Sequence, residues 1–226
     1  MRLAIVIPTL NEEAVLSASL DRAHQAGDIV VVSDGGSEDH TLEIARRRAT
    51  RVVTSEAGRG RQLNRGAAAA IEEGATALLF LHADTRLPPD ARTMVQEALE
   101  SGALGGGFPV RFDSTRRIFR LGARIVNLRT RLLRAPLGDQ AQFVKASVYS
   151  AMGGFQSWPI LEDLDFISRL RRQGRVAVLE TPVTTSARRF TERGIAKTIA
   201  INWLIWGLFL VGVEPDRLAR MYPQIR

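Results

Sequence analysis

Cysteine is absent from this sequence of 226 residues. Its absence excludes disulfide bonds, thiolate zinc sites, iron–sulfur clusters and a cysteine nucleophile, and it favours a reducing compartment. Lysine is nearly absent too, because only Lys145 and Lys197 are lysine among 31 basic residues. Hydrophobic residues make up 45% of the chain and charged residues 24%, an ordinary globular composition. We therefore expect a single cytoplasmic domain over residues 1–226.

Acidic residues are missing from one segment that carries much positive charge. Residues 116–134 contain seven arginines and no Asp or Glu, so this segment accounts for the whole formal net charge of +7. A basic surface confined to one segment argues against nucleic acid as a partner. Two parallel stripes run along the segment at helical spacing. The apolar stripe is Ile118, Leu121, Ile125, Leu128 and Leu132, and the basic stripe is Arg117, Arg120, Arg124 and Arg131.

Three interpretations of this basic helix remain open. It could lie on an anionic membrane surface, which would make the protein peripheral to the inner face of the membrane. It could instead bind an acidic or phosphorylated acceptor. The third interpretation is a helix that turns its apolar stripe to the core and its arginines to solvent.

The uncharged stretch 198–213, between Lys197 and Glu214, is too short to cross a bilayer. As a helix it would extend about 24 Å, whereas the hydrocarbon core is roughly 30 Å thick. We expect a buried or membrane-interfacial helix, or a subunit contact that forms a homo-oligomer.

Short apolar runs alternate with amphipathic stretches along the first half of the chain. We expect strands at 3–7, 29–32, 51–54 and 77–81. Four helices should follow them in turn: the first is capped by Asn11, the second begins at Ser37, the third covers 63–71 and the fourth opens after Pro89. A strand at 105–113, the basic helix, a strand at 143–145, a helix at 160–172 and a strand at 176–179 follow. This alternation predicts an α/β fold with a mostly parallel sheet, in which ligands bind beyond the carboxyl ends of the strands.

The glycine-rich signatures of two nucleotide-binding classes are absent from those strand ends. Neither Gly-x-Gly-x-x-Gly nor a Gly-Lys-Ser/Thr phosphate loop is present, which excludes a dinucleotide-binding Rossmann unit and a P-loop NTPase. The first strand is followed by Pro8-Thr9-Leu10-Asn11-Glu12, and the second by Asp34-Gly35-Gly36-Ser37. Asp34 could hydrogen-bond a ribose or base, or it could cap its own turn.

Two further clusters carry groups suited to chemistry. His82-Ala83-Asp84-Thr85 follows the fourth strand and points two ligand-capable side chains to one side, a spacing that suits a cation bridging a diphosphate. Glu162, Asp163 and Asp165 lie at an expected helix start, where acids also serve helix stability.

Together these motifs resemble the family 2 glycosyltransferases, whose fold is the nucleotide-diphospho-sugar transferase fold known as GT-A. The resemblance extends from Ile5 to about Arg189 and depends on the order and spacing of residues 8–12, 34–37, 60–66, 81–85, 153–155 and 162–163. It is closer still to small bacterial members with His-Ala-Asp-Thr and Gly-Asp-Gln segments, sometimes labelled radical-SAM/selenodomain-associated transferases. The resemblance implies a three-layer sandwich around a mostly parallel sheet, with a nucleotide-sugar-binding half (1–110) and an acceptor half (111–226).

For the donor side, the resemblance implies a nucleotide-diphosphate sugar as the bound partner. Pro8, Glu12 and Asp34 would line the base and ribose site, with Arg61 near the nucleotide. Asp84 would bind a divalent cation, Mn²⁺ or Mg²⁺, that holds the diphosphate. The family's first metal-motif acid is replaced here by His82, and a nearby imidazole favours Mn²⁺ slightly.

For the acceptor side, the resemblance implies that Asp163 is the general base that deprotonates an acceptor hydroxyl, with inversion at the sugar carbon in one displacement. Glu162 would shape the acceptor pocket. Processive synthases carry Gln-x-x-Arg-Trp where this chain has Ser186-Ala187-Arg188-Arg189-Phe190, so processive synthesis is not expected. Arg188 or Arg189 could neutralise the departing diphosphate, or they could be solvated.

Two other functions stay open at this point. A nucleotidyltransferase would need a glycine-rich basic signature after the first strand, where residues 8–12 stand instead. A non-catalytic nucleotide-sugar-binding or membrane-associated accessory protein is favoured by the His82 replacement and opposed by the intact Glu162-Asp163 pair.

Overall fold

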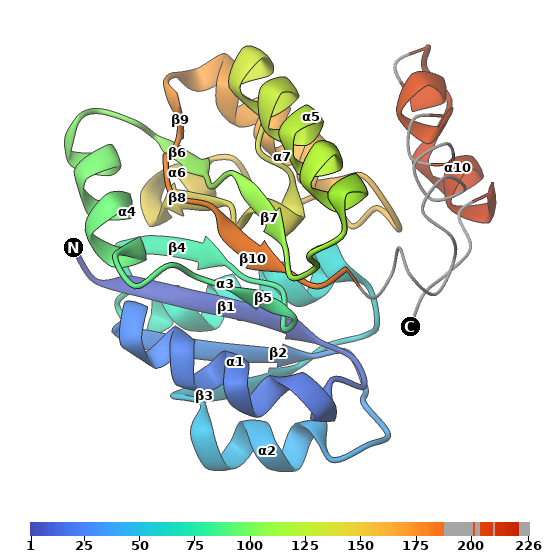
Figure 1. Cartoon of the computed structure of the whole chain (residues 1–226). Coiled ribbons are helices and arrows are strands. Elements are labelled where there is room, and N and C mark those ends of the chain that lie inside the picture. The colour runs from blue at the N-terminus through green and yellow to red at the C-terminus, as the bar shows by residue number, and fades with distance from the viewer. Residues whose placement is uncertain (188–200, 202–203, 210, 222–226) are drawn as a thin grey trace.

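The computed structural model describes residues 1–187, 201, 204–209 and 211–221. Its centre is a seven-stranded sheet in the order β3-β2-β1-β4-β8-β6-β9, with helices on both sides (Figure 1). The strands of this sheet are β1 (Leu3–Thr9), β2 (Ile29–Asp34), β3 (Arg51–Thr54), β4 (Ala77–Phe80), β6 (Gly105–Gly107), β8 (Phe143–Lys145) and β9 (Val176–Val178). The helices are α1 (Glu13–Ala26), α2 (Thr41–Arg48), α3 (Arg59–Glu72), α4 (Ala91–Glu100), α5 (Arg117–Leu133), α6 (Ala146–Ala151), α7 (Glu162–Gln173) and α10 (Pro215–Met221).

The sheet is mostly parallel, as the sequence predicts. Strands β1, β2, β3 and β4 run in one direction, and β8 runs antiparallel to both of its neighbours, β4 and β6. Parallel pairing places the carboxyl ends of β1, β2 and β4 at one edge. The loops expected to bind the donor therefore leave the sheet side by side.

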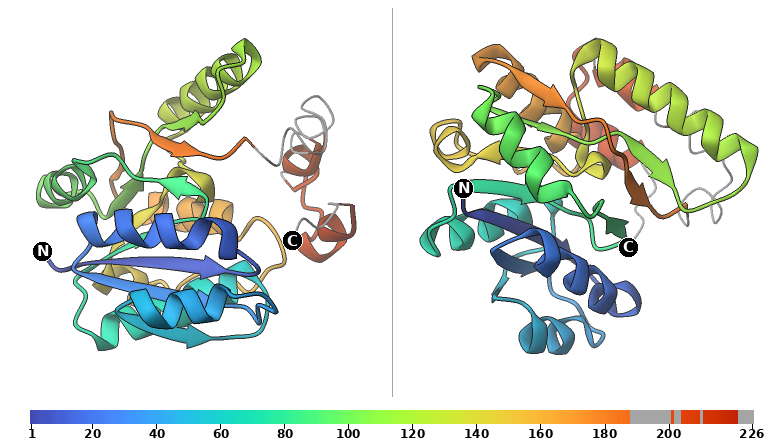
Figure 2. Two further views of the ribbon diagram at one scale, coloured as in Figure 1. Left: turned by 60° about the horizontal axis from the view of Figure 1, so that its bottom comes forward. Right: turned by 60° about the vertical axis from the view of Figure 1, so that its left-hand side comes forward.

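The alternation of side chains along β1 builds a core on each face of the sheet. Leu3, Ile5 and Ile7 pack in the same cluster as buried residues of α1, α2 and α4. Ala4 and Val6 point the other way and pack with α3, α6 and α7. The result is the expected three-layer arrangement, which Figure 2 shows from two further directions.

The strand expected at 105–113 is divided between two sheets. β6 ends at Gly107, and β7 (Val110–Phe112) joins a separate sheet of order β5-β10-β7 with β5 (Thr85–Arg86) and β10 (Val183–Thr185). The division falls at Pro109, which has no backbone N–H to donate and whose carbonyl accepts a hydrogen bond from Val183. The small sheet carries α5 above the main one.

The start of two helices differs from the sequence prediction. Asn11 does not cap α1: its φ is +55°, its side chain accepts a hydrogen bond from the backbone of Glu38, and the helix begins at Glu13. α2 begins at Thr41 rather than Ser37, because Asp39 accepts the backbone N–H of Thr41 there. The first shift comes from a contact between two loops that are distant in sequence, and the second comes from a local hydrogen bond.

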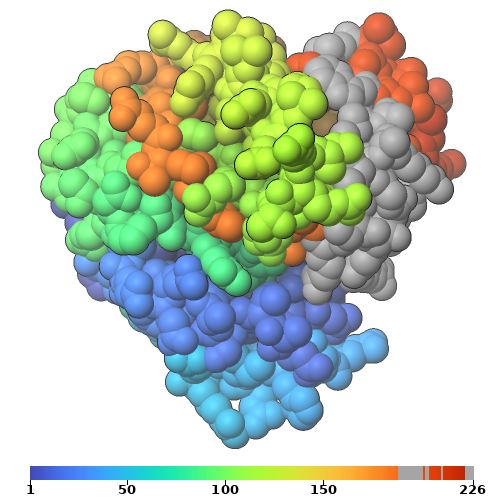
Figure 3. All heavy atoms as spheres, viewed as in Figure 1, coloured from blue at the N-terminus to red at the C-terminus, as the bar shows by residue number. Residues whose placement is uncertain are grey.

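Helix α5 turns its apolar stripe outward. The relative exposures are 46% for Ile118, 58% for Leu121, 50% for Ile125, 59% for Leu128 and 74% for Leu132. The buried positions of the helix are instead Phe119, Ala123 and Thr130. The core-facing interpretation of the stripe is therefore wrong, and Figure 3 shows the yellow-green atoms of α5 at the molecular surface.

The described part of the C-terminal apolar stretch packs on α5 and on the loop before α7. Ile205 is buried, the Trp206 ring lies 5.9 Å from the Arg129 guanidinium, and the rings of Phe209 and Trp158 are 6.0 Å apart. No helix among the described residues is both long enough and apolar enough to cross a membrane.

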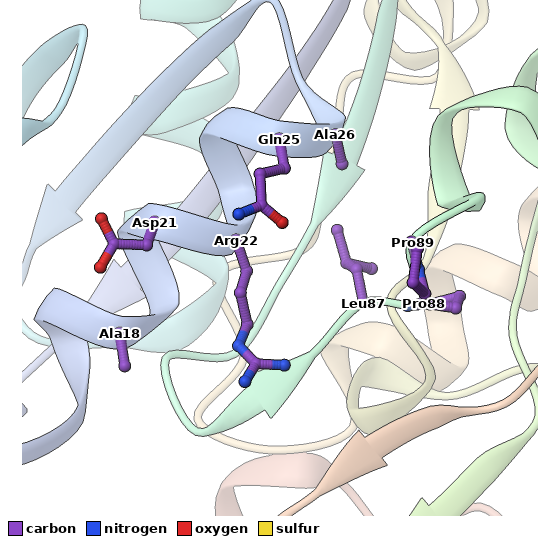
Figure 4. A pocket seen from close by; sticks show the side chains of 8 residues that line it. All are labelled: Ala18, Asp21, Arg22, Gln25, Ala26, Leu87, Pro88 and Pro89. Carbon is purple, nitrogen blue, oxygen red and sulfur yellow. The ribbon is translucent and has the colours of Figure 1, made fainter.

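A hollow of about 490 Å³ separates α1 from the loop before α4. It is lined by Asp21, Arg22 and Gln25 on one side and by Leu87, Pro88 and Pro89 on the other (Figure 4). None of the site residues predicted from the sequence lines it, so this hollow is separate from the carboxyl edge of the sheet.

Candidate active site

The turn after β2 is fastened at the carboxyl edge of the sheet by Asp34. This fully buried carboxylate accepts hydrogen bonds from the Thr9 hydroxyl (2.9 Å) and from the backbone N–H groups of Gly36 (2.9 Å) and Ser37 (2.8 Å). Asp34 therefore shapes its own turn and ties it to the end of β1. A direct bond from Asp34 to a ribose or base stays a prediction.

A buried amide from α3 closes the same edge from below. Nε2 of Gln62 donates to the carbonyl oxygens of Thr9 (2.6 Å), the last residue of β1, and Ser33 (3.2 Å), the residue before the last of β2. A Cβ atom at Gly35 would lie 2.9 Å from that Nε2 atom, so glycine lets the turn sit directly on Gln62. The two strand ends are thereby held in fixed positions.

The other predicted donor residues of the first loop lie beside this turn. Pro8 is half-buried and pairs with Ser33 in the parallel register of β1 and β2. Glu12 is half-buried at the start of α1, and its backbone N–H donates to the Thr41 hydroxyl at 2.8 Å. The fold therefore brings Pro8, Glu12 and Asp34 to one edge.

The two predicted residues of the metal motif follow β4. His82 and Asp84 are both half-buried, and the backbone N–H of Thr85 donates to the His82 carbonyl at 3.0 Å, which closes the turn between them. Among the described residues, no group of three or more His, Asp or Glu side chains could hold a metal ion. A cation here would take Asp84 from the chain and its other ligands from a diphosphate and water, which suits Mg²⁺ or Mn²⁺ arriving with a nucleotide.

The acid pair opens α7 directly after Leu161, whose φ is +65°. Glu162 is only 1% exposed, and its Oε1 atom accepts a hydrogen bond from Nε of Arg59. Asp163 is 13% exposed, and its Oδ2 atom lies 3.7 Å from Nη2 of the same Arg59. One guanidinium therefore faces both acids.

Asp163 and the metal motif meet at Gly138. The Gly138 N–H donates to Oδ2 of Asp163 at 2.6 Å, and a Cβ atom at Gly138 would lie 3.0 Å from that oxygen and 3.4 Å from Nε2 of His82. The other oxygen of Asp163 accepts the N–H of Leu164 at 2.8 Å. The loop after β4 and the first turn of α7 thus converge on one point, although they are far apart in sequence.

The electrostatics of this cluster keep Arg59 charged. Burial acts to lower the pKa of Arg59, but the charges of Glu162 and Asp163 outweigh it and raise that pKa above its usual value. Burial raises the pKa of the Glu162 carboxyl, the Asp163 charge adds to the rise, and Arg59 opposes it. The resulting assembly is two carboxylates around one cation.

A second arginine approaches from α5. Burial lowers the pKa of Arg129, and the carboxylates of Asp139 and Asp163 oppose that change. Its Nη2 atom donates to Oε1 of Gln140 at 3.3 Å, and Gln140 is itself fully buried. The basic helix therefore contributes one arginine to the acid pair's surroundings while its other arginines face solvent.

Of the three arginines predicted for the donor side, only Arg61 lies among the described residues, and it is not part of this cluster. Arg61 is about half exposed and pairs with Glu56 at 2.7 Å. Arg188 and Arg189 lie outside the described residues.

The model of one protein family, Glycosyl transferase family 2, matches residues 4–162. The match ends at Glu162 and spans the three loops of the carboxyl edge. The chain belongs to glycosyl transferase family 2. No curated protein matches it.

Solved structures show that this family 2 chain has the GT-A fold. The structure of residues 1–349 of TarS from S. aureus matches with a TM-score of 0.63 at 17% identity, covering 96% of this chain and 68% of that one. The same fragment in complex with UDP matches at 0.62 and 19% identity, covering 83% and 61%. Glucosyl-3-phosphoglycerate synthase from Mycobacterium tuberculosis, in complex with Mn²⁺, UDP and glucosyl-3-phosphoglycerate, matches at 0.53 and 21% identity, covering 81% and 70%. Family and fold together support a glycosyltransferase that uses a nucleotide-sugar donor.

Sequence reasoning missed the most central cation of this family 2 site. Arg61 was chosen from the Gly58-Arg59-Gly60-Arg61 stretch, whereas Arg59 reaches the acids. The sequence offers no local signal that separates the two arginines; the structure shows that a Cβ atom at Gly60 would lie 2.3 Å from the Gln156 carbonyl oxygen. That close approach packs the start of α3 against the loop before α7 and brings Arg59 to Glu162.

Proposed function

We propose that this chain is an inverting glycosyltransferase, dependent on a divalent cation, that moves a hexosyl unit from a nucleoside diphosphate to an acceptor hydroxyl. The observation that carries the proposal is the convergence of Asp163, Gly138 and His82 at the carboxyl edge of the sheet. It joins the loop of the metal motif to a carboxylate fixed by two backbone N–H groups, within a family 2 fold.

Asp163 is the general base of this proposal. Its two hydrogen bonds from Gly138 and Leu164 occupy one acceptor site on each oxygen, and a carboxylate offers about four such sites. An acceptor hydroxyl can therefore approach a remaining lone pair. As its oxygen bonds to the sugar carbon, the bond to the diphosphate breaks, the proton passes to Asp163, and the nucleoside diphosphate leaves.

Glu162 and Arg59 set the charge around this base. Glu162 is buried against the guanidinium, which leaves Asp163 as the more exposed acid of the pair. Arg59 balances the two carboxylates and so limits the repulsion between Asp163 and an incoming diphosphate. Glu162 accordingly shapes the acceptor side rather than exchanging a proton.

On the donor side, Pro8, Glu12 and Asp34 would line the nucleotide, with Arg61, Arg188 and Arg189 contributing positive charge. Asp84, beside His82, would hold the cation. When bound, such a cation would supply positive charge to the departing diphosphate. The neighbours that contain UDP, and in one case Mn²⁺, support this assignment of the donor.

The test compares three carboxylates of the same helix turn. Asp163→Asn should lower turnover by roughly 10²–10⁴-fold, the usual value of a general base, with nucleotide affinity nearly unchanged. Glu162→Gln should lower it less and should weaken acceptor affinity. Asp165→Asn is the matched control, because Asp165 pairs with Arg169 at 2.7 Å and should be dispensable for turnover.

The products distinguish the proposal from its rivals. Release of nucleoside diphosphate identifies a glycosyltransferase, whereas release of pyrophosphate identifies a nucleotidyltransferase. Near-normal turnover by Asp163→Asn would mean that the base lies elsewhere. Nucleotide-sugar binding without any product, over a broad acceptor panel, would indicate the accessory protein.

A further inference from the structure

The side chains that are buried between α5 and the rest of the protein lie outside its apolar stripe. On the opposite face, the Phe119 ring packs 5.5 Å from the Phe112 ring, and the Asn127 side-chain amide exchanges two hydrogen bonds, of 2.8 and 2.9 Å, with the backbone of Val110. The Thr130 hydroxyl donates to Gln140 at 2.9 Å. α5 is therefore attached through one face, and the five Ile and Leu side chains of the stripe are exposed on another face.

A contiguous exposed row of this kind marks an interaction surface. Leu132 is 74% exposed, and no member of the row is less than 46% exposed. Isolated exposed leucines are common on proteins, but five on one helical line are not. The row needs an apolar environment that the described residues do not supply.

Charge decides which occupant fits the row. The basic stripe Arg117, Arg120, Arg124 and Arg131 is exposed and runs beside the apolar row, and residues 116–134 hold no acid. A second copy of the chain docked by this face would bring two such stripes together, and their like charges would repel. An occupant with an anionic surface and an apolar interior could contact the arginines with its surface and the Ile and Leu row with its interior.

We propose that α5 docks the protein on an anionic lipid bilayer. The Ile and Leu row enters the boundary between headgroups and acyl chains, and the arginines extend their guanidinium groups to lipid phosphates. The helix lies in the plane of the interface. Attachment is peripheral and reversible, because it depends on one helix and on charges that salt screens.

Vesicle co-sedimentation tests the proposal with the whole chain. We expect wild-type protein to bind vesicles of phosphatidylcholine with about 30% phosphatidylglycerol and to ignore pure phosphatidylcholine. Leu121→Ser/Leu128→Ser should lower the partition coefficient by roughly tenfold or more, and Arg120→Glu/Arg124→Glu should do the same. About 0.5 M NaCl should release the wild type.

A matched control separates local docking from general charge attraction. Arg171→Glu/Arg172→Glu makes the same change of charge at two exposed positions of α7 and should alter binding less than about twofold. All six substituted side chains are exposed and none is assigned to the catalytic site, so we expect every variant to fold. Thermal unfolding of each variant checks this.

Three outcomes would overturn the proposal. Wild-type protein could ignore anionic vesicles at low salt. The serine variant could bind as well as wild type, which would reduce the effect to charge adsorption. Finally, self-association in sedimentation equilibrium that Leu121→Ser/Leu128→Ser abolishes, without vesicle binding, would assign the row to a second copy.

Discussion

Arg59 donates a hydrogen bond to Glu162 across 103 residues of chain. Arg59 is the first residue of α3 and Glu162 the first residue of α7, so the pair joins the amino ends of two helices on the same face of the sheet. The same guanidinium reaches Asp163. One side chain therefore sets both the packing of these helices and the charge around the proposed base.

Arg59→Leu should destabilise the fold and impair turnover. The substitution leaves the Glu162 carboxylate buried without its cation, so we expect a loss of about 3 kcal/mol in the free energy of unfolding. This value is at the low end for a buried pair, because the Arg59 side chain is 34% exposed. Urea denaturation measures it.

Two variants control this prediction. Arg59→Leu/Glu162→Leu removes both charges and should recover much of the loss, because no unpaired charge remains buried. Arg61→Leu breaks only the exposed pair with Glu56 and should change stability by less than about 0.5 kcal/mol. Equal losses in the single and double variants would contradict the assigned role of Arg59.

Gly138→Ala should lower turnover with little effect on folding. The added methyl group would lie 3.0 Å from Oδ2 of Asp163 and 3.4 Å from Nε2 of His82, which displaces the carboxylate from its aligned position. We expect a fall in kcat of roughly tenfold to a hundredfold. Gly122→Ala is the control: it meets nothing within 4 Å and should stabilise α5 by about 0.5–1 kcal/mol. Unchanged kinetics for Gly138→Ala would separate this glycine from the chemistry.

Asp84→Ala should abolish the cation-dependent part of nucleotide binding, and His82→Ala should weaken it modestly. The reason is that Asp84 is the one carboxylate of the metal motif, while an imidazole is a replaceable ligand. Calorimetry with nucleoside diphosphates, with and without Mn²⁺, measures both effects. Equal affinity of wild type and Asp84→Ala in the presence of Mn²⁺ would disprove the assignment of the cation to Asp84.

Asp28 should give the fold a measurable dependence on acid. Burial acts to raise the pKa of Asp28, but hydrogen bonds from Arg92 and from the N–H of Leu3 outweigh burial and lower it below 3.8. A carboxyl whose pKa is lower in the folded chain stabilises the fold above its unfolded value, and that contribution is lost as pH falls through the folded value.

Asp28→Asn should therefore cost about 1 kcal/mol at pH 7 and progressively less below pH 3.8. The measurement is denaturant unfolding of both proteins at several pH values. A difference in stability that stays constant from neutral to strongly acidic pH would show that the charge of Asp28 plays no part.

Local sequence patterns predicted most of the sheet. The apolar runs that became β1 to β4 and β8 are short, β-branched or aromatic, and bounded by turn residues, so each specifies its own strand. The prediction of one continuous strand at 105–113 was wrong for a non-local reason. The strands that pair with its two parts, β8, β9 and β10, all come later in the chain. The predicted cap of α1 was wrong for a similar reason, since Asn11 hydrogen-bonds across two loops with Ser37 and Glu38.

Only those residues of the candidate site could be predicted that belong to a motif, which is recognised from the types of its residues and their order along the chain. Asp163, Glu162, Asp84 and His82 stand in motifs that can be found along the chain. Arg59 could not be preferred over Arg61 by any local rule, because its partner lies on a distant helix. The direction of the α5 stripe was equally undecidable, since a helical period identifies a face but does not say what that face meets.

The three tryptophans, Trp158, Trp203 and Trp206, all fall within residues 111–226, the part of the chain that we propose binds the acceptor. Trp158 packs on Phe209, and Trp206 lies over Arg129 of α5. The carboxyl edge of β1, β2 and β4, where we propose that the nucleotide binds, contains no tryptophan. Intrinsic tryptophan fluorescence of the native chain is therefore an optical probe of one part of the molecule. Shifts of the emission report events around α5 and α7, whereas the edge proposed for the donor contributes no tryptophan emission of its own.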